Sequence, residues 1–215
     1  MKTAETVLAL ARQELGIRES PAGSNQVKYN TWYYGRAVSG SAYPWCMVFV
    51  QWCFDQVGAA ALLPLRTASC GALMRAAQKA NLWVTQDFLP GDVVIYDFSG
   101  SGSTDHTGIV ERITSTGVTA IEGNTSQAGS QSNGGEVCRK HRSRQQIVGA
   151  VRPLYETEAN PMDNTPSPAH KEGVEWAVKN GILTGDSGGD LRLSEAVTRQ
   201  QLCTMLKRLA DLLKS

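Results

Sequence analysis

The sequence lacks the features of several large classes of protein. Its 215 residues carry 21 Lys and Arg against 20 Asp and Glu, with no dense basic stripe, so nucleic acid is not expected as a partner. No apolar run approaches the length of a membrane span, so stable membrane insertion is not expected. The N-terminal residues include an early acid and do not resemble a signal peptide, which predicts synthesis in a cytoplasm.

Paired cysteines are also missing. Five cysteines are present, an odd number, and none forms a C-x-x-C pair. This pattern argues against a disulfide framework and against a zinc site. No cofactor is expected either. The one short basic cluster, residues 139–144, is interpreted as a solvated hairpin end, with contact to an anionic polymer as the alternative.

The pattern of apolar residues changes along the chain. The first part shows helical periodicity, and the part after residue 87 shows short alternating runs separated by turn residues. Helices are predicted over residues 3–15, from 46 onward and over 69–80, and strands over 93–97, 106–113, 118–124, 135–140 and 147–153. Helices followed by an antiparallel sheet indicate an α+β domain.

Cys46 is the first candidate for chemistry. Pro44 suits the start of a helix, and the apolar run from Cys46 to Phe54 predicts a helix buried on most sides. A thiol at a helix N-terminus is close to free N–H groups, which favour the thiolate and could bind an oxyanion. The alternative is an inert buried thiol, the role also expected for Cys53.

A cysteine nucleophile needs a base and a group that orients it. Among the three histidines, His106 begins a predicted strand after a Gly/Ser loop. Glu122 and Asn124 lie two apart on the neighbouring strand, so they are predicted to share a face from which they could orient the imidazole. The alternatives are a strand-end histidine and an exposed polar pair.

An aromatic segment precedes the cysteine. Residues 26–36 mix aromatic and polar side chains and are predicted to be irregular. We take Tyr29 and Trp32, together with Trp45, as candidate substrate contacts lining a groove. The alternative is that these rings pack onto the core.

Four of these pieces together resemble the CHAP amidohydrolases, within the NlpC/P60 and papain-like group. They are Tyr43–Cys46 opening a helix, Pro90–Val93 opening the sheet, Asp105–Val110, and Ile121–Asn124. The resemblance covers roughly residues 3–155. It implies papain-like N-terminal helices packed on the sheet, with Cys46 as nucleophile, His106 as base, Glu122 as orienting acid and Asn124 as polar helper. Some CHAP enzymes carry an acidic calcium loop before the cysteine; residues 36–45 contain no acid, so no metal is expected.

The tail has a different composition. Residues 156–168 are polar and Pro-rich and are predicted to be a linker. Residues 169–215 are predicted to be a small all-α module, with one helix over 169–180 and another after Thr198 as N-cap.

This tail resembles an S-layer homology module, through Trp176–Leu183, Gly185–Asp186 and Val197–Arg199. The resemblance implies binding of a secondary cell-wall polymer, with Trp176, Gly185, Asp186 and Arg199 as contacts. The alternative is a helix–loop–helix that only docks on the catalytic domain. Such modules usually occur in threes and this chain holds one, so either a monomer or a trimer is expected.

The two resemblances together imply an endolysin-like peptidoglycan hydrolase that acts at the bacterial cell wall after release. The expected reaction is that of an N-acetylmuramoyl-L-alanine amidase. The alternatives are an endopeptidase acting on the stem or cross-bridge peptide, and a non-catalytic wall-binding protein.

Overall fold

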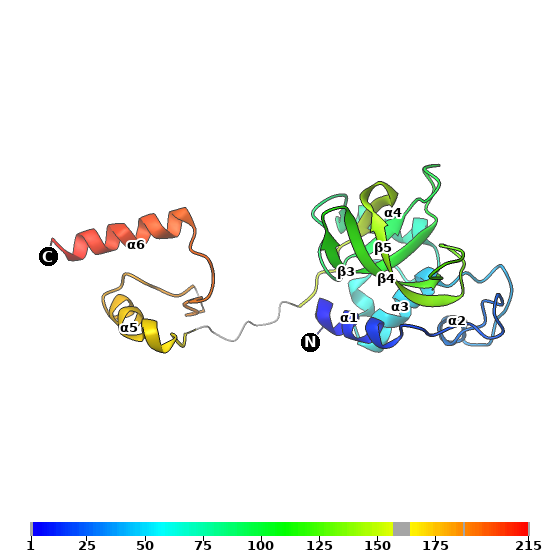
Figure 1. Cartoon of the computed structure of the whole chain (residues 1–215), viewed down its shortest axis with the longest axis horizontal. Helices are drawn as coiled ribbons and strands as arrows, with labels where there is room; N and C mark the ends of the chain where they lie inside the picture. Colours follow the sequence, from blue (N-terminus) through cyan, green and yellow to red (C-terminus); the bar gives the residue numbers. More distant parts are fainter. Residues whose placement is uncertain (1, 157–163, 187, 215) are drawn as a thin grey trace. The chain divides into compact units, whose positions relative to one another are not determined.

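The computed structural model describes residues 2–156, 164–186 and 188–214. The chain divides into two compact units, with the boundary between Thr157 and Glu158 (Figure 1). Most of the predicted linker falls on residues 157–163, which lie outside the described residues.

The first unit begins with its helices. Their bounds are α1 (Ala4–Gln13), α2 (Lys28–Tyr34), α3 (Cys46–Gln56) and α4 (Cys70–Lys79). Side-chain hydroxyls cap two of them: Thr3 accepts from the N–H of Thr6 at α1, and Ser69 accepts from the N–H of Ala72 at α4. The structure confirms the helices predicted at these two positions and at Cys46.

Helix α2 corrects the prediction that residues 26–36 are irregular. Tyr29 is completely buried, and the amide of Asn30 donates to the backbone carbonyls of Asn25 and Tyr43. These anchors hold a segment rich in aromatic residues, which have low helix propensity, in a helical turn. Tertiary packing therefore outweighs local preference here.

The strands form one antiparallel sheet in the order β1-β6-β2-β3-β4-β5. Their bounds are β1 (Trp83–Val84), β2 (Val93–Tyr96), β3 (His106–Thr114), β4 (Gly117–Thr125), β5 (Glu136–Ser143) and β6 (Ile147–Val151). Strand β1 was not predicted because two residues are too few to show alternation. Strand β5 continues to Ser143, beyond its predicted end at Lys140, and this extension changes the interpretation of the basic cluster.

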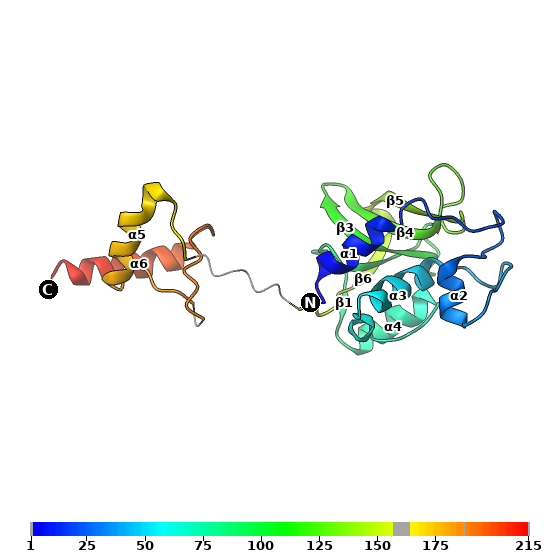
Figure 2. The ribbon, with the colours of Figure 1, turned by 90° about the horizontal axis from the view of Figure 1, so that it is seen from below.

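Helix α3 is the centre of the first unit. Eight of its eleven residues are buried, as its unbroken apolar run predicts. It packs against β3 and β4, and Figure 2 shows α2, α3 and α4 gathered on one side of these strands. A Cβ added to Gly123 of β4 would lie 2.6 Å from Phe49 Cβ and 2.8 Å from Trp45 Cζ3. The glycine thus allows the start of α3 to approach the strand that carries Glu122.

The second unit contains two helices, α5 (Lys171–Lys179) and α6 (Arg199–Leu212). Thr198 caps α6 in a reciprocal capping box with Gln201, which confirms the predicted N-cap. The fold class is therefore α+β with a small all-α C-terminal module, as predicted. Across the described residues, none of the helices combines the length and apolar character that a membrane span requires.

Candidate active site

Cys46 is the first residue of α3, and the local structure leaves the helix start open. The N-cap residue, Trp45, contributes no side-chain hydrogen bond to the end of the helix. The first backbone N–H groups therefore remain available to an anion. The N–H of Met47 is one of the groups that lower the pKa of the Cys46 thiol.

His106 is the first residue of β3 and lies against Glu122 of β4. Their side chains are completely buried, and His106 Nε2 is 3.1 Å from Glu122 Oε2. The ring of Tyr96 stacks on the imidazole, with 6.1 Å between the centroids and 18° between the planes. A Cβ added to Gly108 would lie 2.6 Å from Glu122 Cγ, so this glycine provides the space that the carboxylate occupies.

The electrostatics of Cys46, His106 and Glu122 favour a thiolate–imidazolium pair. Contact with Cys70 is the largest influence lowering the pKa of Cys46; burial opposes it, and His106 lowers it further. Burial lowers the pKa of His106, but Cys46 and Glu122 outweigh burial and raise it to about 9. His106 Nδ1 is buried and has no hydrogen bond of ordinary geometry within the described chain. It is therefore the nitrogen available to exchange a proton with Cys46.

Cys70 is a site residue that the sequence analysis missed. It is the first residue of α4, is 7% exposed, and has a pKa raised well above the usual value, first by Cys46 and then by burial. It is therefore a neutral thiol that can donate to the Cys46 thiolate. The signal was present in the sequence, since Ser69 marks a helix start at Cys70 just as Pro44 does near Cys46.

Arg142 is a second residue that was missed, and it corrects the interpretation of residues 139–144 as a solvated hairpin end. It lies on the extended β5, is 3% exposed, and forms an ion pair with Glu122. The prediction ended this strand at Lys140, so the alternation of side chains was not continued to Arg142. Alternation continued from Cys138 would have placed Arg142 on the inner face.

Asn124 is completely buried, and neither its Oδ1 nor its Nδ2 has a hydrogen-bond partner in the described part of the chain. Its φ is 57°, and the β4–β5 register shifts between Glu122 and Thr125. The alternation that predicted one shared face for Glu122 and Asn124 therefore does not extend to Asn124. An unpartnered buried amide is costly, which is consistent with a polar role at a site.

The predicted aromatic contacts divide into two groups. Tyr29 and Trp45 are completely buried and stack on each other at 5.3 Å, so they have no surface to offer a substrate. This corrects the expectation for both residues, because their rings pack in the core. Trp32 is partly exposed, lies 5.2 Å from the Arg66 guanidinium, and stays a predicted contact.

The four residues predicted to bind a wall polymer lie in the second unit. Gly185 and Asp186 line a hollow of about 620 Å³, whereas Trp176 and Arg199 do not. Trp176 is 49% exposed. Asp186 forms an ion pair with Arg192 at 2.9 Å and accepts from the N–H of Gly188, so it also shapes its own loop.

The described residues include no group of three His, Cys, Asp or Glu side chains placed to hold a metal ion. The assembled chemistry is that of a thiol, an imidazole and a carboxylate. These are the parts needed for nucleophilic attack on a carbonyl and transfer of a proton to a leaving group.

Comparisons with known proteins point to the same region. The family model of the CHAP domain matches residues 38–124, less than half of the chain, and this span contains Cys46, His106, Glu122 and Asn124. No curated protein matches. Among solved structures, Ly7917 is similar at 19% identity over 70% of this chain and 62% of that chain, with a TM-score of 0.40. The wild-type endolysin LysIME-EF1 is similar at 18% identity over 73% of this chain and 67% of that chain, also with a TM-score of 0.40.

Proposed function

We propose that the first unit is a cysteine-dependent peptidoglycan hydrolase, specifically an N-acetylmuramoyl-L-alanine amidase. The observation that carries the proposal is the juxtaposition of a Cys46 thiol of lowered pKa at a helix start with the buried His106–Glu122 pair. The match of residues 38–124 to the CHAP domain supports peptidoglycan as the substrate.

The geometry supports a two-step reaction. The Cys46 thiolate attacks the amide carbonyl, and the free N–H groups at the start of α3 stabilise the oxyanion. Protonated His106 gives its proton to the departing amine as the C–N bond breaks, which leaves a thioester. His106 then takes a proton from water, the water oxygen attacks the thioester, and the acid product leaves as the thiolate and imidazolium are restored.

Glu122 keeps the imidazole in the orientation that this cycle needs. Its pKa is governed first by burial, which raises it, but contacts with Arg142 and His106 outweigh burial and lower it. The carboxylate therefore stays ionised beside the imidazolium that forms during the cycle.

Digestion of purified peptidoglycan, followed by mass spectrometry of the released fragments, tests this function. The wild-type protein is expected to release intact peptides and leave free lactyl ends on the sugar. Cys46→Ala is expected to release nothing above background. Cys203→Ala is the matched control, because Cys203 is exposed on α6, and it should retain full activity.

The same spectra separate the alternatives. Cut peptides that remain on the sugar would replace the amidase by an endopeptidase with the same nucleophile. Equal release by wild type and Cys46→Ala would exclude Cys46 as the nucleophile. No release by either from walls of several bacteria would favour a non-catalytic wall-binding protein.

We also propose that the protein is made in a reducing cytoplasm and reaches the wall after release. All five cysteines are free thiols, which suits a reducing compartment. Binding of a secondary wall polymer by the second unit is part of the same proposal.

A further inference from the structure

We propose that Arg142 is a positioning residue of the active site, which holds Glu122 in place against His106 and extends the Cys46–His106–Glu122 set by one member. The inference rests on the proposed function, because it assigns Arg142 a role in the same thiol chemistry. It also predicts the state of the Cys46 thiol itself, which can be measured without any substrate.

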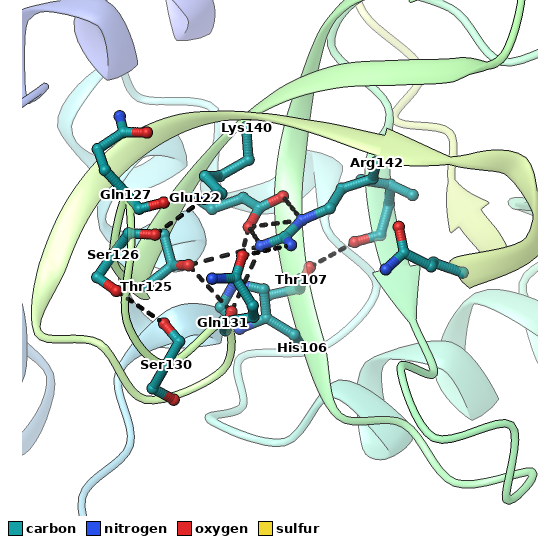
Figure 3. A network of polar contacts seen from close by, with 12 residues as sticks. His106, Thr107, Glu122, Thr125, Ser126, Gln127, Ser130, Gln131, Lys140 and Arg142 are labelled. Atoms are coloured by element: carbon teal, nitrogen blue, oxygen red, sulfur yellow. Dashed lines mark hydrogen bonds and ion pairs between the residues drawn. The ribbon is translucent and has the colours of Figure 1, made fainter.

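The contacts between Arg142 and Glu122 occupy both carboxylate oxygens. Arg142 Nε donates to Glu122 Oε1 at 2.9 Å and to Oε2 at 3.2 Å, and Nη2 donates to Oε2. Glu122 Oε2 also lies 3.1 Å from His106 Nε2. The carboxylate therefore bridges the guanidinium and the imidazole, as Figure 3 shows.

The sheet brings these three residues together from separate strands. Ala120 pairs with both Val110 of β3 and Lys140 of β5, so these three share one face. Side chains two apart on a strand point the same way, which places His106, Glu122 and Arg142 on that face as well. The arrangement depends on strand register and does not require a flexible loop.

The guanidinium is itself fixed on several sides. Its Cζ lies 4.6 Å from the ring of Phe98 and 5.6 Å from that of Tyr96. Nη1 donates to Gln131 Oε1 at 2.9 Å, and Nη2 donates to the Gln131 carbonyl at 3.4 Å. Gln131 belongs to the connection between β4 and β5, which Lys140 also holds by donating to the carbonyl of Ser126 at 2.9 Å. Arg142 thus has little freedom to rotate away from Glu122.

The charge of Arg142 matters because Glu122 is completely buried. A buried carboxylate without a cation takes up a proton, and a neutral acid would no longer stabilise the imidazolium. The other titratable groups that face Glu122 are His106 from β3, Tyr96 from β2 and Cys138 from β5. Arg142 is the fixed cation among them.

A role confined to folding would not explain this arrangement. A buried ion pair contributes little net stability compared with apolar residues of similar volume, because desolvation of both charges is expensive. A buried Arg–Glu pair whose carboxylate also touches the imidazole of a candidate base is better explained by orientation and charge at that base.

Alkylation of Cys46 by iodoacetamide across a range of pH, resolved by peptide mass spectrometry, tests the proposal. Exposed Cys203 provides an internal reference for reagent activity. Arg142→Met should let Glu122 protonate, lower the pKa of His106 and raise that of Cys46. If the pKa of Cys46 rises by about one, its alkylation rate falls about tenfold at pH values below both the wild-type and the variant pKa. Arg142→Lys keeps the charge and should recover much of the wild-type profile.

The chain offers a matched control on the same strand. Arg139 of β5 makes a bidentate pair with Glu111, with Nε to Oε2 at 2.6 Å and Nη2 to Oε1 at 2.9 Å, but this pair is near the surface and apart from His106. Arg139→Met should leave both the alkylation profile and the release of peptidoglycan fragments unchanged.

A double variant decides whether Arg142 acts through Glu122. Glu122→Gln and Arg142→Met should each shift the profile, and the combination should shift it no further than Glu122→Gln alone. The double variant also removes both buried charges, so it serves as the folded test if Arg142→Met does not fold. Fully additive shifts would overturn the proposal, as would a folded Arg142→Met with the wild-type profile.

Fragment release then distinguishes this proposal from the proposed function. Arg142→Met should lower kcat for peptidoglycan with little change in KM, because Arg142 does not touch the substrate. If the wild-type protein releases nothing from peptidoglycan, the proposed function fails, while the alkylation profiles still decide the role of Arg142.

Discussion

At the scale of single residues, the site depends on keeping a proton on His106 and off Cys46. Cys70, a neutral thiol at the start of α4, is the largest influence lowering the pKa of Cys46, and His106 adds to it. The imidazole, whose pKa is raised, in turn holds its proton up to about pH 9. The reactive form of the pair therefore exists between the lowered pKa of the thiol and the raised pKa of the imidazole.

This arrangement predicts the pH dependence of the reaction. Below the pKa of Cys46 the thiol is protonated and does not attack, and above about pH 9 His106 has no proton for the leaving amine. We expect hydrolysis and Cys46 alkylation to persist below neutral pH, and hydrolysis to fall as pH rises through about 9. Initial rates and alkylation rates over roughly pH 5 to 10 measure both limits. A Cys46 whose alkylation rises only near pH 8.5, as for an ordinary thiol, would contradict the ion pair.

Cys70 gives a second prediction at this scale. Cys70→Ala removes the donor and should raise the pKa of Cys46. If that pKa rises by about one, alkylation of Cys46 slows about tenfold at pH values below both the wild-type and the variant pKa. Cys70→Ser keeps a hydroxyl donor and should lie closer to wild type. Cys53→Ala is the control, because Cys53 is buried on the same helix as Cys46 but is not among the main influences on its pKa. Equal profiles for Cys70→Ala and Cys53→Ala would show that Cys70 is a packing residue only.

At the scale of elements, the site depends on how closely α3 approaches β4. Gly123→Ala would place a methyl group within 3 Å of both Phe49 and Trp45. The helix start must then move away from the strand that carries Glu122, at a cost of about 1–3 kcal/mol for overpacking. We expect lower stability and loss of the lowered pKa of Cys46. Urea unfolding followed by labelling of the completely buried Cys53 reports on this unit alone.

The control for this change is another glycine-to-alanine substitution. Gly173 lies in α5, and a Cβ added there would meet nothing within 4 Å. Gly173→Ala should leave labelling of Cys53 unchanged, since it lies in the other unit and gains helix propensity locally. An unfolding midpoint for Gly123→Ala equal to that of wild type would show that α3 and β4 accommodate the methyl group without separating.

The elements with strong local signals were the ones that the sequence predicted well. The apolar run after Cys46 predicted α3, and alternation predicted β3 and β4. Helix α2 escaped prediction because its helical form depends on burying Tyr29 in a core that lies elsewhere in the chain. The same burial removed Tyr29 from the predicted groove. The local periodicity of a sequence does not reveal which distant segments a side chain packs against.

The candidate active-site residues were predictable where the order of strands mattered little. Cys46 and His106 each begin an element, Glu122 lies within β4, and all three were named from residue type. The structure brings them together. Arg142 was not found, because its role depends on β5 lying beside β4 and continuing past Lys140. A charged residue on a strand is solvated or buried according to which face of the sheet it occupies. A strand predicted to end a few residues too early assigns no face to the residues beyond that end.

At the scale of the whole molecule, the two units differ in how they bury apolar surface. The first has two clusters of buried apolar side chains, whereas in the described part of the second Ile182 is the one large apolar side chain that is buried. Val178, Leu202 and Leu206 are exposed, in addition to Trp176. Single exposed apolar side chains are common on protein surfaces, so these exposures do not test the predicted binding of a wall polymer.

The last prediction separates binding by the second unit from catalysis by the first. Trp176→Ala and Arg199→Ala, each made in the full chain, should reduce the fraction of protein that sediments with cell walls. They should leave hydrolysis of small soluble muropeptides unchanged, because a soluble fragment does not require anchoring. Gly173→Ala is the matched control, since Gly173 lies on the same helix as Trp176, a Cβ added there would meet nothing within 4 Å, and it is not among the predicted contacts. If both variants sediment as wild type does, the predicted contacts are wrong. If they lose activity on soluble fragments as well, the second unit contributes to catalysis, and the assignment of binding to the second unit and catalysis to the first is wrong.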